Sequence, residues 1–81
     1  MELKYEYVHF VQIENPGRKT ELWECRNNRS GDVLGIVKWY GAWRQYCFFP
    51  NRNTIFNIGC LHTTADFIGI RNTIHKTHVS R

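Results

Sequence analysis

Residues 3–13 and 20–27 show the period of two that is typical of β-strands, and residues 33–40 and 43–49 form apolar segments of strand length. Segments rich in β-branched and aromatic residues are separated by residues that favour turns. The breaks are Asn15-Pro16-Gly17, the polar run from Asn27 to Asp32, and Gly41-Ala42. This pattern predicts strands at about 3–13, 20–27, 33–40 and 43–49, the last three of which form an antiparallel meander.

The spacing changes after Pro50, which ends the fourth strand because proline has no N–H to donate. Residues 54–58 form a short apolar piece that is either an edge strand or an irregular link. From residue 59 the apolar positions recur at intervals of three and four, as in an amphipathic helix. We therefore expect a helix at about 59–74, followed by a frayed tail at 75–81.

These elements predict a single α+β domain at residues 1–81. It consists of a small antiparallel sheet of four strands, or five with the edge strand, and one C-terminal helix packed on one face. A chain of 81 residues has room for one compact core. With 42% hydrophobic and 15% aromatic residues, it is too apolar for intrinsic disorder.

The apolar runs and the cysteines indicate where in the cell the protein resides. No apolar run approaches the roughly 20 residues that span a bilayer, and the first residues lack the apolar region of a signal peptide. Three cysteines, an odd number without regular spacing, fit a reducing compartment. We expect a cytoplasmic protein with no membrane contact.

Charge is distributed unevenly along the chain. Residues 33–81 carry six Lys or Arg against one Asp or Glu, whereas residues 1–32 carry five against six. The positive potential therefore belongs to the second half, which favours a polyanionic partner.

The third and fourth predicted strands place large apolar groups on both faces, although a single helix covers only one. We expect the second face to present aromatic rings interleaved with cations, which suits bases and phosphates. The candidate ligand-binding residues are Lys38, Trp39, Tyr40, Trp43, Arg44 and Tyr46. In the alternative, the first strand folds across this face or forms a homodimer seam, and the cations are only a solvated rim.

Catalytic and metal sites have weak support. Cys60, His62 and Asp66 lie near the predicted helix start, but Cys60 and His62 point about 200° apart on a helix. Cys60, His62, His75 and His78 lack the paired spacing of a zinc site. No phosphate loop, dinucleotide fingerprint or nucleophile elbow occurs. We predict no enzymatic activity, no cofactor and no metal.

Two blocks of sequence resemble a group of small uncharacterised proteins of bacteriophages and prophages. The first block contains Ser30-Gly31-Asp32, Leu34-Gly35, Lys38-Trp39-Tyr40, Trp43-Arg44-Gln45-Tyr46 and Phe48-Phe49-Pro50, and the second contains Thr54-Ile55-Phe56-Asn57, Gly59-Cys60-Leu61 and Asp66-Phe67-Ile68. This resemblance implies a phage accessory protein and carries no function. Three strands before a helix also resemble the plant-type DNA-binding domains that lay a sheet in the major groove, which agrees with the basic second half.

Three hypotheses follow. The first is a nucleic-acid or nucleotide-binding module that uses the candidate residues. The second is a phage-encoded inhibitor of a host defence system, anti-CRISPR-like or similar, which uses the same surface against a protein. The third is a structural homodimer.

Overall fold

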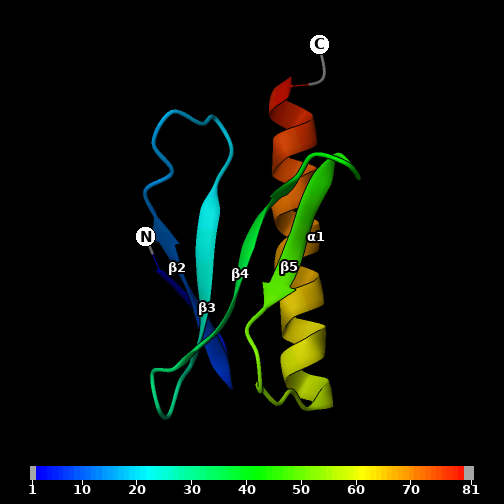
Figure 1. Ribbon diagram of the computed structural model, residues 1–81. Helices are drawn as coiled ribbons and strands as arrows, with labels where there is room; N and C mark the ends of the chain where they lie inside the picture. The colour runs from blue at the N-terminus through cyan, green and yellow to red at the C-terminus, as the bar shows by residue number, and fades with distance from the viewer. Residues whose placement is uncertain (1, 80–81) are drawn as a thin grey trace.

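The computed structural model describes residues 2–79 and consists of one antiparallel sheet and one helix (Figure 1). The strands are β1 (Glu2–Lys4), β2 (Val8–Ile13), β3 (Leu22–Asn27), β4 (Val33–Tyr40) and β5 (Gln45–Pro50), and the helix is α1 (Ile58–Val79). Sheet neighbours follow chain order, β1-β2-β3-β4-β5. The predicted α+β class, the antiparallel meander and the single C-terminal helix are therefore confirmed.

The predicted first strand is divided in two. Residues 5–7 leave the ladder, and β1 turns back to pair with β2, which places Leu3 opposite Phe10. Asn28, in the loop after β3, holds this reversal, because its Nδ2 donates to the carbonyl of Tyr5 at 2.7 Å and to that of Glu6 at 3.0 Å. The contact spans more than twenty residues of sequence, so local alternation could not have predicted it.

The fifth strand consequently comes from the N-terminal segment. Residues 54–57, the first four of the candidate edge strand, are irregular, and residue 58 already belongs to the helix. Asn57 caps this helix, since its Oδ1 accepts the N–H of Cys60 at 2.7 Å. The edge-strand alternative is therefore wrong, and the segment is the link into α1.

Helix α1 is longer than predicted at its C-terminal end. Residues 75–79, placed in a frayed tail, are helical, while residues 80–81 lie outside the described residues. The ring of His75 packs against that of Trp39 with centroids 4.4 Å apart. Such tertiary contact stabilises turns whose own helix propensity is modest. No helix within residues 2–79 has the length and hydropathy needed to cross a membrane.

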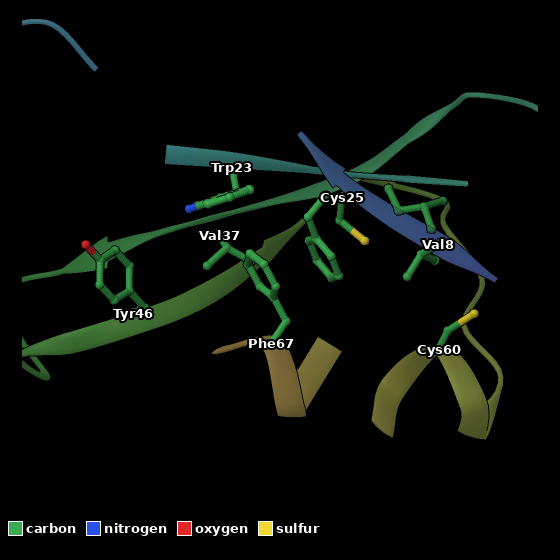
Figure 2. Packing of buried hydrophobic residues seen from close by; sticks show 9 residues of the cluster. Val8, Trp23, Cys25, Val37, Tyr46, Cys60 and Phe67 are labelled. Carbon is green, nitrogen blue, oxygen red and sulfur yellow. The ribbon is translucent and has the colours of Figure 1, made fainter. Parts of the chain in front are cut away.

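The core lies between the sheet and α1 and is centred on Phe67 (Figure 2). Phe67 projects from the helix onto the sheet and stacks on Phe10 with centroids 3.9 Å apart and rings nearly parallel. Trp23 meets Phe67 edge to face at 5.0 Å. The buried apolar residues are Val8, Phe10, Trp23, Cys25, Leu34, Val37, Tyr46, Cys60 and Phe67. A β-bulge opposite Cys25 and Arg26 turns Leu34 into this core.

Glu21, just before β3, ties the sheet to the helix. One oxygen of its carboxylate accepts the indole N–H of Trp23 at 2.8 Å and pairs with the Arg71 guanidinium at 3.2 Å. That guanidinium also lies over the Trp23 ring, 5.2 Å from the centroid. These contacts fix the C-terminal half of α1 against the sheet.

Within residues 2–79, no element packs on the other side of the sheet. We call this surface the open face; its residues on β2 to β5 are His9, Val11, Ile13, Leu22, Glu24, Arg26, Ile36, Lys38, Tyr40, Gln45, Cys47 and Phe49. The helix covers one face only, as predicted, and β1 and β2 widen the sheet instead of folding across the open face. The alternative in which the first strand seals that face is therefore wrong.

Candidate ligand-binding groove

The six candidate residues do not share one surface. Trp39 and Tyr46 are cross-strand partners on the helix side of the sheet, whereas Lys38 and Tyr40 belong to the open face. Trp43 and Arg44 lie in the turn between β4 and β5. The prediction of a single binding face made of all six residues is wrong, and each residue has to be placed separately.

Tyr46 is part of the core and is 2% exposed. Its phenol oxygen accepts the backbone N–H of Glu21 at 2.9 Å, and its own N–H donates to Oδ1 of Asn72 at 2.6 Å. Burial raises the pKa of the phenol, although the hydrogen bond from Glu21 opposes this shift. Tyr46 therefore holds the sheet to the helix and is not accessible to a ligand.

Lys38 points away from Trp39, onto the open face. Its Nζ lies over the ring of Phe49, 4.7 Å from the centroid. This cation–π contact leaves Lys38 on the side of the sheet opposite to the tryptophan with which it was grouped.

The β4–β5 turn projects Trp43 and Arg44 beyond the sheet. The N–H of Trp43 donates to the carbonyl of Tyr40, and that of Arg44 to the carbonyl of Gly41, both at 3.2 Å. Arg44 has a φ of 54°, a left-handed conformation that non-glycine residues seldom adopt. The ring of Trp43 is 65% exposed and meets Tyr40 edge to face at 5.1 Å. The predicted strand start at residue 43 is thus a turn, and β5 begins at Gln45.

A groove of about 550 Å³ lies between this turn and the last turns of α1. Figure 1 shows the β4–β5 turn beside the C-terminal part of the helix. The residues that line the groove are Trp39, Trp43, Arg44, Gln45, Asn72, Thr73, His75 and Lys76. Trp39 and Trp43 supply two indole rings, one half-buried and one exposed, to the same hollow.

The electrostatics of the groove are one-sided. Arg44 approaches from the turn and Lys76 from the helix, and both are exposed. Among the lining residues there is no Asp or Glu. The amides of Gln45 and Asn72 and the hydroxyl of Thr73 add neutral donors and acceptors. The groove therefore combines aromatic surface with positive charge, an arrangement that suits a flat, anionic ligand.

Comparison with known proteins places the chain in a family. It is 36% identical over 63 residues to the "Uncharacterized 9.3 kDa protein" of Acholeplasma phage L2, a match that covers 78% of this chain and 81% of the phage protein. The chain belongs to the family of this 9.3 kDa phage protein. No protein-family model matches it, and no solved structure is significantly similar. The sequence predicted a protein of an uncharacterised phage group, and the match to a phage protein agrees with this prediction.

The sequence did not predict the helix side of the groove, which α1 lines with four residues. Asn72, His75 and Lys76 were assigned to the end of the helix or to a frayed tail. Their spacing of three and four residues was nevertheless a usable signal, because it places all three on one face of a continuous helix.

The residues considered for a catalytic or metal site do not lie together in the structure. Cys60 lies in the core, whereas His62 and Asp66 are exposed. Among the described residues, no three His, Cys, Asp or Glu side chains gather in a way that could hold a metal ion. The side chain of His78 lies outside the described residues.

Proposed function

We propose that this protein is a non-enzymatic module that binds a nucleotide unit, free or within a single-stranded nucleic acid, in the groove between the β4–β5 turn and α1. The observation that carries the proposal is the convergence of two indole rings and two cations, Trp39, Trp43, Arg44 and Lys76, around one groove. Its volume of about 550 Å³ is within the range of small-ligand sites.

Each group has a separate task in this proposal. Trp43, the more exposed ring, stacks on a base, an interaction worth roughly 1–3 kcal/mol. Arg44 meets the phosphate, because its guanidinium can form two parallel hydrogen bonds with phosphate oxygens. Lys76 adds a second cation, which offsets the partial negative charge at the C-terminal end of α1.

The groups needed for catalysis are not gathered at the groove. Among its lining residues there is neither a carboxylate nor a thiol. The thiols of Cys25 and Cys60 are buried in the core, and burial raises the pKa of Cys25 to about 11. Binding without turnover is therefore the simplest role that this arrangement supports.

Substituting Trp43→Ala is expected to weaken binding of a fluorescently labelled single-stranded oligonucleotide about tenfold, because one stacking contact is lost. Fluorescence anisotropy at low ionic strength measures this change. Ile55→Ala is the matched control, since Ile55 is 89% exposed and lies outside the groove, and it should bind like the wild-type chain.

The phosphate contact is tested by Arg44→Gly, which removes the charge and suits the left-handed turn. This variant should be at least as stable as the wild type, bind more weakly, and show a shallower salt dependence because about one phosphate contact is lost. The proposal is wrong if the wild type binds no DNA, RNA or nucleotide at low salt. It is equally wrong if both groove variants bind as the wild type does.

A further inference from the structure

We infer that the open face of the sheet is a homodimer interface, on which a second copy of this chain packs face to face. This inference does not depend on the groove, which lies on the helix side of the molecule.

The open face carries two adjoining rows that are rich in apolar side chains. In one row, cross-strand pairing joins Val11, Glu24, Ile36 and Phe49, and in the next it joins Ile13, Leu22, Lys38 and Cys47. These rows run across β2, β3, β4 and β5 without interruption. Six of these eight half-buried side chains are apolar, and an apolar patch that extends over four strands of a small chain is typical of an interaction site.

The exposed area is large for a chain of this mass. A folded monomer of 9.7 kDa should expose about 5,100 Å², whereas this chain exposes 5990 Å². The difference is close to the roughly 800 Å² that each partner contributes to an interface of standard size. Covering about 800 Å² of the open face would bring the exposed area of one chain close to the value expected for a compact protein of its mass.

The charged residues of the open face are held within the chain, Glu24 and Arg26 as an ion pair and Lys38 against an aromatic ring. Nε of Arg26 donates to the Glu24 carboxylate at 2.9 Å, and Lys38 lies over the ring of Phe49. The chain as a whole carries a formal charge of +4, and the groove is basic. Two copies would repel each other through their basic surfaces, so the nearly balanced open face is the surface on which they can meet.

Pairing through the sheet edges is disfavoured, which points to association by faces. On the outer strand β5, Asn72 occupies the N–H of Tyr46, and Pro50 has no N–H. The opposite edge, β1, is only three residues long. Neither edge offers a long ladder to a second chain, whereas the open face offers a broad contact surface.

Light scattering after size exclusion, from low to high micromolar concentration, tests the dimer. We expect the wild type to reach twice the 9.7 kDa of one chain. Ile36→Lys should remain at the monomer mass, because it places an unpaired cation in the centre of the interface. Ile55→Lys makes the same change at a site outside the open face and should dimerise as the wild type does. A wild type that stays monomeric overturns the inference, as does a dimer that Ile36→Lys leaves intact.

A second measurement uses the wild-type chain alone and remains decisive if Ile36→Lys does not fold. Cys47 belongs to the open face, whereas Cys25 and Cys60 are buried in the core. Maleimide labelling of Cys47 should slow as protein concentration rises, because the second copy covers it. Labelling that is independent of concentration excludes this interface. The Arg44→Gly variant should dimerise normally, which separates failure of this inference from failure of the proposed ligand site.

Discussion

Replacing Phe67 with alanine is expected to cost about 3–5 kcal/mol of unfolding free energy, the range observed when a buried phenylalanine is truncated. Phe67 is 1% exposed and is the ring through which α1 meets the sheet, stacked on Phe10 and edge to face with Trp23. Its removal leaves a cavity between the two layers. Domains of this size have little stability to spare, so the variant should be largely unfolded at room temperature.

Urea unfolding followed by tryptophan fluorescence measures this loss, because Trp23 lies within the affected core. The control is Ile70→Ala on the same helix, where the side chain is 50% exposed and the expected cost is below about 1 kcal/mol. If the two variants unfold at similar urea concentrations, Phe67 is not the centre of the core.

The fold followed from the sequence where local chemistry determines it. Alternation and turn residues located β3, β4 and most of β5, and the change of spacing located α1. The division between β1 and β2 did not follow, because it depends on Asn28 in a distant loop. The last turn and a half of α1 was missed for a similar reason: Trp39 packs on His75, and sequence periodicity does not report such a contact.

The candidate site was only partly predictable. Cross-strand pairing puts Trp39 and Tyr46 on the same face, but β4 and β5 are apolar on both faces, so the pattern could not tell which face the helix covers. The helix covers theirs, which buries Tyr46 and leaves Trp39 at the rim of the groove. Trp43 and Arg44 remain accessible because they lie in the turn beyond the sheet, where they face the last turns of α1 across the groove.

The unfolding free energy is expected to fall as the pH rises from about 9 to about 11. Burial raises the pKa of the Cys25 thiol from 9.0 to about 11, although the Thr64 hydroxyl opposes the shift. Within this window the unfolded chain loses the proton while the folded chain keeps it, so the unfolded state gains stability. A pKa shift of this size lowers the unfolding free energy by about 2–3 kcal/mol once the pH has passed the pKa of the folded state. Below pH 9 the thiol is protonated in both states and contributes no pH dependence.

Urea titrations at pH 8 and at higher pH, compared between the wild type and Cys25→Val, isolate this contribution. Valine fills a similar volume in the core and cannot ionise, so the variant should lose less stability over the same interval. Part of the fall should persist in the variant, because the pKa of Tyr46 is also raised by burial and acts in the same direction above pH 10. Equal losses in the two chains would show that the Cys25 thiol does not control the alkaline unfolding. A larger loss in the wild type would show that ionisation of this buried thiol, which lies at the β-bulge beside Leu34, contributes to the alkaline loss of stability.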